Sequence, residues 1–446
     1  MKPPSGIPTS GRDFDRLCFQ FLIFCLLASC SVTRLPLKFG YSPKYSAMIY
    51  ADTPILIVLF LFILLYRALN PGKAHPWRID TSFLPMALVG IWWLGSGLIM
   101  ARNPELFWSS IVQFAGGIAA FLLLPGILGA YGLTAFTLDT FLKMSVLVAL
   151  GSIGQVIVQP ARLFENPNSS LGVNHAQLGL YMLFALTVAL FRSSRRPGWL
   201  CPVSAVLAFI VIFISGSRAA QIGSVPVLVA FFLNRLSFAN LVKLGLAGFL
   251  MASALWMAVE NRKENKAQGN MSFEMGNGVQ VDVSSGRRLL MWMVTWKAIT
   301  SSPRNFIAGF GYTNYRWEYG KSIKLPFYTN AAHNAYIHVW AETGLIGFAL
   351  FLWMYWAPMR RAFALRKHLP EMTVAAGLVA GVFLTGFTQE TMYPNEAFAN
   401  INVLYAAICA TLFLAARLAQ EERDALAGEA SAEEARSLPG AIPLQG

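Results

Sequence analysis

The segment His333-Asn-Ala-Tyr-Ile-His-Val-Trp-Ala-Glu-Thr-Gly-Leu-Ile-Gly347 is the point where a long polar stretch, residues 259–334, gives way to a new apolar span. In a chain that is otherwise very hydrophobic, this junction delivers His333 to a membrane surface. Histidine is the side chain whose unperturbed pKa lies nearest neutrality, so it suits proton transfer. The segment therefore predicts a site for chemistry at one face of a bilayer.

The rest of the chain reads as a series of membrane spans. Hydrophobic residues make up 56% of the 446 residues and charged residues 13%, whereas a soluble protein carries about 25% charge. Spans of about 20 apolar residues recur along the chain, and the alternation that a transmembrane barrel requires is not seen. We therefore expect an all-α, polytopic membrane protein with about 12 transmembrane helices. The candidate spans are roughly residues 14–32, 54–68, 83–101, 107–130, 138–158, 175–191, 200–216, 218–234, 239–258, 335–357, 371–388 and 398–417.

These spans divide the chain into four parts. Residues 1–258 hold helices 1 to 9, residues 259–334 form one large outer loop, residues 335–417 hold helices 10 to 12, and residues 418–446 form a polar tail. The short loops on the side of the N-terminus contain eleven Lys and Arg residues, against six in the short loops on the other side. By the positive-inside rule, both termini are cytoplasmic and the large loop lies outside.

The net charge of +13 does not predict a nucleic-acid partner. Much of it is the positive-inside bias, and no basic arm or aromatic-interleaved patch is present to bind a polynucleotide. The outer loop is also basic, with ten Lys and Arg against five Asp and Glu. Topology does not explain that excess, and an anionic ligand would.

The five cysteines lie in or at the ends of apolar spans, so neither a disulfide framework nor a metal cluster is predicted. The stretch Leu27-Ala-Ser-Cys30 resembles a lipoprotein cleavage box. Small residues before a cysteine are common in apolar spans, and we expect residues 14–32 to remain as the first helix.

An interfacial helix is predicted inside the outer loop. The stretch from Arg288 to Ile299 is amphipathic, with Trp292 and Trp296 one turn apart, and a serine at 284 or 285 would cap its start. Such a helix would lie along the membrane interface, which makes membrane lipids an expected partner.

Three arginines are candidates for holding an anion. Arg218 interrupts an apolar tract that folds into two short spans, which places it near the outer surface. Arg287 and Arg288 open the interfacial helix, where a planar guanidinium and the helix N-terminus both suit phosphate oxygens. The alternatives are a turn arginine that snorkels to water, for Arg218, and attraction to lipid headgroups, for Arg287 and Arg288.

The remaining candidates are His333, His338 and Glu342. For His333 the alternative to catalysis is packing at an interface. His338 and Glu342 lie at i,i+4 on one helical face, either as a buried proton pair or as a link between neighbouring helices. No spacing resembles a zinc site, and no acidic cluster is typical of a divalent-cation glycosyltransferase. Neither a metal nor a cofactor is therefore expected.

The chain resembles the O-antigen ligase and polymerase superfamily of the bacterial inner membrane. Three motifs carry the resemblance: Ser217-Arg218 after an apolar span, Gly-Arg-Arg-Leu-Leu-Met-Trp at residues 286–292, and His333-Asn334 followed by Glu342 and Gly344-Leu-Ile-Gly347. Each motif alone is weak, but their order around one outer loop is fairly specific. The resemblance implies a GT-C-like helical fold with one large periplasmic loop and metal-independent, inverting transfer.

By this resemblance, the donor is a glycan linked to undecaprenyl diphosphate and the acceptor is a hydroxyl of lipid A–core. Arg218 and Arg288, with Arg287 as a partner, would hold the diphosphate, and His333 would be the general base. One alternative is a polymerase that uses a second lipid-linked glycan as acceptor. Another, from a different class, is a transporter of lipid-linked sugars, for which inverted repeats and broken helices or charges near mid-membrane are expected. A single large outer loop favours the ligase.

Overall fold

The structure is a computed structural model of the full chain. It describes residues 9–31, 36–39, 47–50, 81–158, 175–195, 198–233, 272–275, 279–315, 332–389, 391–393 and 399–437, and a few positions between 55 and 65. The first half holds α1 (Thr9–Ser31), the short 3-10 helix η2 (Thr81–Phe83), α3 (Leu84–Met100), α4 (Pro104–Tyr131), α5 (Thr134–Val158), α7 (His175–Ser193), α8 (Leu200–Ile214) and α9 (Arg218–Leu233). The second half holds α11 (Val283–Ile299), α12 (Pro303–Ala308), α14 (Ala335–Leu365), α15 (Met372–Thr385) and α16 (Ala399–Ser437).

Most of the predicted spans coincide with these helices. Among the described residues, six helices are long and apolar enough to cross a membrane, and α8, α9 and α15 are shorter apolar helices. The protein is therefore a multi-pass membrane protein. The predicted span 239–258 lies outside the described residues, as does most of span 54–68, so the total of twelve stays a prediction.

The structure also contains two short antiparallel hairpins that an all-α fold did not lead us to expect. They pair β1 (Pro36–Phe39) with β2 (Ala47–Tyr50), and β3 (Ser272–Met275) with β4 (Val279–Asp282). The second hairpin leads directly into α11. This helix begins at Val283, before the serines at 284 and 285 that were expected to cap it.

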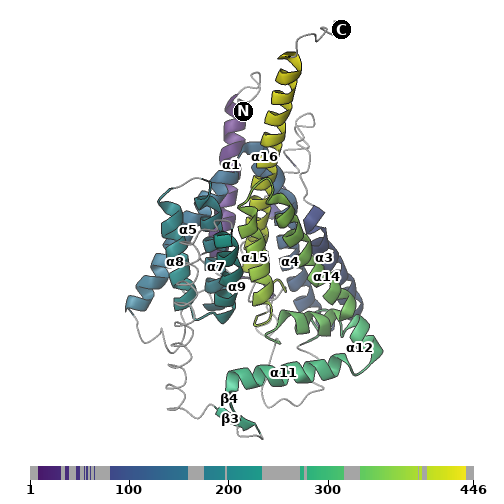
Figure 1. The fold of residues 1–446 in the computed structure, drawn as a ribbon. Coiled ribbons are helices and arrows are strands. Elements are labelled where there is room, and N and C mark those ends of the chain that lie inside the picture. Colours follow the sequence, from purple (N-terminus) through teal and green to yellow (C-terminus); the bar gives the residue numbers. More distant parts are fainter. Residues whose placement is uncertain are drawn as a thin grey trace.

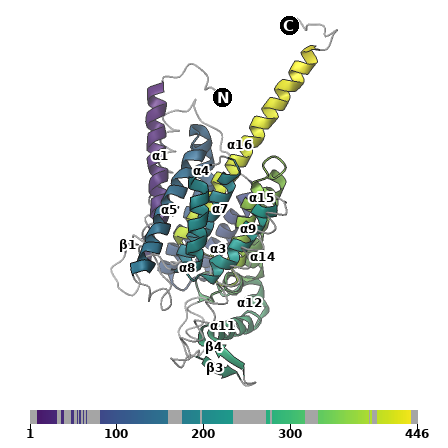
Figure 2. The ribbon, with the colours of Figure 1, turned by 60° about the vertical axis from the view of Figure 1, so that its left-hand side comes forward.

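The molecule has two distinct ends. The helices of the bundle run side by side, the start of α1 and the end of α16 lie at one end, which we call the end of the termini, and α11 and α12 lie beyond the other end (Figure 1). A view from another side shows the same arrangement, with β3 and β4 beside α11 (Figure 2). Helix α16 continues without a break past the predicted start of the tail at residue 418, and its side chains are exposed from Glu421 to Glu429.

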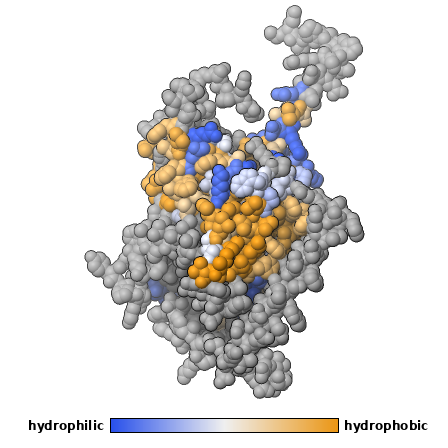
Figure 3. All heavy atoms as spheres, turned by 90° about the vertical axis from the view of Figure 1, so that its left-hand side faces the viewer, coloured by the Kyte–Doolittle hydropathy of each residue, from blue (hydrophilic) through white to orange (hydrophobic). Residues whose placement is uncertain are grey.

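The flanks of the bundle are apolar. Figure 3 shows a broad hydrophobic surface over the middle of one face, with hydrophilic residues gathered toward the end that carries the termini. Large apolar side chains point outward from several helices, including Ile99 on α3, Leu147 on α5 and Val206 on α8. Contiguous exposed apolar surface of this extent is typical of lipid-facing helices.

Helices α9 and α15 approach each other closely through glycines. A Cβ atom at Gly381 would lie 2.3 Å from the Gly223 carbonyl oxygen, and one at Gly377 would lie 2.7 Å from that of Pro226. Without side chains, the two backbones can pack at a distance that other residues prevent. This contact fixes α9, and with it Arg218 at its start.

Helix α14 is broken at Gly344, which adopts φ 67° and ψ −172°. Donors from elsewhere in the chain bind the three carbonyl groups just before the break. The amides of Phe310 and Gly311 donate to Ala341 and Glu342, both at 2.8 Å. The indole of Trp92 on α3 donates to Thr343 at 3.1 Å. The loop after α12 is thereby joined to α14 by backbone hydrogen bonds.

We predict that Gly344→Ala is strongly destabilising. A left-handed φ costs a residue with a Cβ about 1–2 kcal/mol, and the new Cβ would also lie 2.0 Å from the Ile307 carbonyl oxygen. Thermal unfolding of the purified protein in detergent measures the effect. The matched control is Gly428→Ala on α16, where a Cβ meets no atom within 4 Å. Equal melting temperatures for both variants would contradict the tight contact at the break.

Candidate functional site

His333 stands immediately before α14, at the end of the bundle away from the termini. It is half-buried and adopts φ 52°, a left-handed conformation that few non-glycine residues occupy. Asn334 caps the helix, because its side-chain oxygen accepts from the amides of Tyr336 at 3.0 Å and Ile337 at 3.1 Å. The Ala335 amide donates to the Gly386 carbonyl at the end of α15. The backbone around His333 is therefore held on both sides.

Glu342 is the centre of a buried hydrogen-bond network. Its carboxylate accepts from the Thr313 amide at 2.8 Å and the Tyr315 amide at 2.7 Å, and the Tyr393 hydroxyl also donates to it. Burial first, and then the Glu342 charge, raise the pKa of Tyr393, so this phenol keeps its proton and donates. Glu342 thus joins α14 to the loop after α12 and to the turn after α15.

His338 lies beside this network. Its Nε2 is 3.7 Å from Glu342 Oε1, and its ring lies between those of Tyr315 and Tyr393, at centroid distances of 4.4 and 4.3 Å. The structure thus places the predicted pair His338 and Glu342 close together. The bonds that Glu342 accepts come mainly from the loop, which favours the role of linking elements over that of a proton pair.

Arg288 lies on a face of α11 that contacts Ala332, the residue before His333. The indole of Trp292, one turn after Arg288, donates to the Ala332 carbonyl at 2.8 Å. Arg288 is half-buried. Because α11 begins at Val283, both arginines stand in its second turn and not at its first residues, where the free amides are. Arg287 lies in the described helix, but its side chain lies outside the described residues.

Arg218 is exposed and opens α9 after the tight turn Ser215-Gly216-Ser217. Gly216 adopts φ 63°, and the Ser217 hydroxyl accepts from the Ala220 amide at 3.3 Å, which caps the helix. The predicted hairpin of two short spans is therefore confirmed. Arg218 lies at the same end of the bundle as His333, because α9 packs against α15 and the end of α15 bonds Ala335. Arg288 is linked more directly, since Trp292 on its own helix bonds Ala332.

The sequence patterns missed most of the residues that hold the site together. Nothing in the pattern around Tyr393 or Thr313 signalled that they bind Glu342. The spacing of Trp292 from Arg288 was visible, and it is the residue that connects α11 to Ala332. The pair Gly309 and Gly311 was visible too, and both adopt positive φ, at 76° and 102°.

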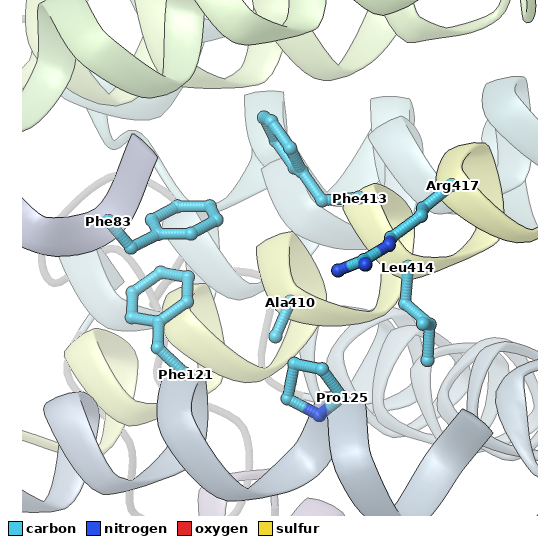
Figure 4. Close-up of a pocket in the computed structure, with 7 residues that line it drawn as sticks. All are labelled: Phe83, Phe121, Pro125, Ala410, Phe413, Leu414 and Arg417. Atoms are coloured by element: carbon cyan, nitrogen blue, oxygen red, sulfur yellow. The ribbon is translucent and has the colours of Figure 1, made fainter. Parts of the chain in front are cut away.

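A separate crevice lies near the other end of the bundle, between α4 and α16 (Figure 4). Phe83, Phe121 and Phe413 line it, and the Arg417 side chain reaches over it. The Arg417 Nε already pairs with Glu421 at 3.2 Å. This crevice lies between helices that pack together at the end that carries the termini. None of its lining residues belongs to the region around His333.

In the comparison with known proteins, a family model matches the part of the chain that holds the candidate residues. Residues 203–352 match the family model described as O-antigen ligase. This segment contains Arg218, Arg288, His333 and Glu342, and its match supports the predicted O-antigen ligase and polymerase superfamily. No curated protein matches the chain. Among the described residues, no group of three or more His, Cys, Asp or Glu side chains could hold a metal ion.

We predict that Glu342→Gln destabilises the protein by about 1–3 kcal/mol, the usual cost of a buried polar group left unsatisfied. Each carboxylate oxygen accepts from a backbone amide, so either orientation of the glutamine places an NH₂ group against an N–H donor. Chemical unfolding in detergent measures the change. Tyr393→Phe is the milder companion, because it removes one donor and leaves both amides bonded. A Glu342→Gln protein as stable as the parent would contradict this network.

Proposed function

We propose that the protein is a glycan ligase of the bacterial inner membrane. It transfers an O-antigen glycan from undecaprenyl diphosphate to a hydroxyl of lipid A–core, at the periplasmic face. The observation that carries the proposal is the hydrogen bond from Trp292 to Ala332. It brings the Arg288 face of α11 next to His333, within the segment that matches the O-antigen ligase family.

In the proposed reaction, Arg218 and Arg288 hold the diphosphate of the donor, with Arg287 as a further candidate. The acceptor oxygen attacks the anomeric carbon as the bond from that carbon to the diphosphate breaks, which inverts the centre. Negative charge grows on the leaving diphosphate, and fixed guanidinium groups stabilise it most in the transition state. Undecaprenyl diphosphate is released carrying both electrons of the broken bond.

His333 is the proposed general base, which takes the proton of the acceptor hydroxyl as the new bond forms. The hydrogen bonds at Ala332, Asn334 and Ala335 hold the backbone on both sides of His333, which restricts where a positioned base can lie. The activated donor supplies the driving force. We expect neither a metal nor a cofactor, because the arginines provide the positive charge.

The closest rival is a polymerase, which differs only in its acceptor, a second lipid-linked glycan. The family match supports both reactions. For a transporter, a broken helix is a further expected feature, since unwound carbonyls coordinate the coupling ion. Helix α14 is broken, but Phe310, Gly311 and Trp92 already bind the three carbonyls just before the break. These bonds support a structural break over an ion site.

We predict that His333→Ala abolishes transfer while donor binding stays nearly intact, because a base acts in the chemical step. Arg218→Lys and Arg288→Lys should each lower the rate by about 10²–10³-fold, since lysine keeps the charge but loses the planar fork. Glycan ligation is followed in cells that lack the native enzyme, at matched protein levels.

The controls for these variants are His368→Ala and Arg304→Lys. His368 lies between α14 and α15 at the far end, and Arg304 is exposed on α12. Both controls should ligate normally. Near-normal ligation by His333→Ala would mean that this histidine only packs where the chain meets the membrane.

The proposed orientation predicts that reporters fused after residue 265 or 325 are periplasmic. Fusions at 195, 364 and 440 should be cytoplasmic, because the short loops on that side are the richer in Lys and Arg. Paired alkaline phosphatase and fluorescent protein fusions measure this. A cytoplasmic reporter at 265 and 325 would remove the periplasmic site.

A further inference from the structure

Helix α11 has one buried face and one exposed face. Met291, Thr295 and Ile299 are buried at 3%, 0% and 0% exposure, whereas Leu289 and Met293 are exposed. Trp292 lies beside this buried face, one turn after Arg288. The placement of the buried face therefore decides where the Arg288 side chain lies relative to His333.

A second polar contact besides that of Trp292 holds this face. Thr295 Oγ1 lies 2.9 Å from the Tyr315 hydroxyl, and both residues are fully buried. The Thr295 hydroxyl donates its only hydrogen to the Met291 carbonyl. The Tyr315 hydroxyl is therefore the donor to Thr295. Buried polar groups in this position are costly to leave without partners, so the contact fixes where α11 can sit.

Tyr315 is itself firmly held. Its amide donates to Glu342 Oε1 at 2.7 Å, and its ring stacks on His338 at a centroid distance of 4.4 Å. Glu342 and His338 belong to α14, the helix that His333 precedes. A continuous chain of contacts thus runs from α14 through Tyr315 to Thr295, two turns after Arg288 on α11.

We propose that Tyr315 and Thr295 are positioning residues that set the place of Arg288 for the diphosphate of the lipid-linked donor. This inference rests on the proposed function. The contacts of Trp292 and Thr295 hold α11 at two points one turn apart, which limits its rotation and sliding. Bidentate binding of phosphate by arginine needs placement within about 0.5 Å, so loss of one contact weakens donor binding without removing any charge.

The test uses the full-length protein in lipid nanodiscs, with undecaprenyl diphosphate as the probe. Tyr315→Phe removes one hydroxyl and keeps the stacked ring, and Thr295→Val keeps the shape of the side chain. Each variant should weaken probe binding about three- to tenfold. The double variant should bind no more weakly than either single variant, because both remove the same contact.

The matched control is Thr300→Val, at the exposed end of the same helix, where the hydroxyl bonds only carbonyls of α11. It should bind the probe like the parent. Parental affinity in Tyr315→Phe, or additive losses in the double variant, would overturn the positioning role even if the melting temperature falls.

Arg288→Ala in the same assay separates this inference from the proposed function. If Arg288→Ala weakens probe binding and Tyr315→Phe does not, only the positioning role fails. If Arg288→Ala binds the probe like the parent, the diphosphate site fails, and the positioning role is overturned with it.

Discussion

The break in α14 at Gly344 is the constraint from which the rest of the candidate site is built. A helix that stops bonding to itself near a membrane leaves carbonyl groups that water does not reach, and each unsatisfied group there costs several kcal/mol. The amides of Phe310 and Gly311 and the indole of Trp92 meet that requirement. The loop after α12 must therefore remain packed against α14 as long as α14 is broken at Gly344.

The side chains around the break extend this attachment toward the candidate residues. Glu342 binds the amides of Thr313 and Tyr315, which lie two and four residues after Gly311 in the same loop. Tyr315 in turn contacts α11. Trp292 of that helix bonds Ala332, the residue directly before His333. An arginine and a histidine that are 45 residues apart in the sequence are thus held in one region by neutral hydrogen bonds and one buried carboxylate.

Much of the fold could be predicted because long apolar runs and tight turns leave local signals. The hairpin whose turn precedes Arg218 is of this kind. The break in α14 could not be predicted, because Gly344 stands in an apolar stretch that suits a continuous helix. Tyr393 was missed for another reason: its bond to Glu342 joins residues 51 apart, and no local period reports such a contact. The start of α11 was expected at a capping serine. It was missed because the β3–β4 hairpin leads directly into the helix.

The candidate residues were found by chemistry and family pattern, whereas the residues that position them appeared only in three dimensions. Arg288 was selected as a phosphate ligand at a helix start, yet it lies in the second turn of α11, and its placement depends on Trp292 and Thr295. The proposed base and the proposed phosphate ligand need a fixed separation to act together. The hydrogen bonds of Trp292 and Thr295 hold α11 near His333.

The central claim is that this end of the bundle transfers a glycan from a lipid diphosphate to a lipid A–core hydroxyl. Reconstitution of the purified protein in nanodiscs, with an undecaprenyl-diphosphate-linked glycan, lipid A–core and excess chelator, tests it most directly. The account predicts a ligated product with inverted anomeric configuration and release of undecaprenyl diphosphate. Elongated lipid-linked glycan with no ligated lipid A–core, or activity that returns only when magnesium or manganese is added, would contradict it.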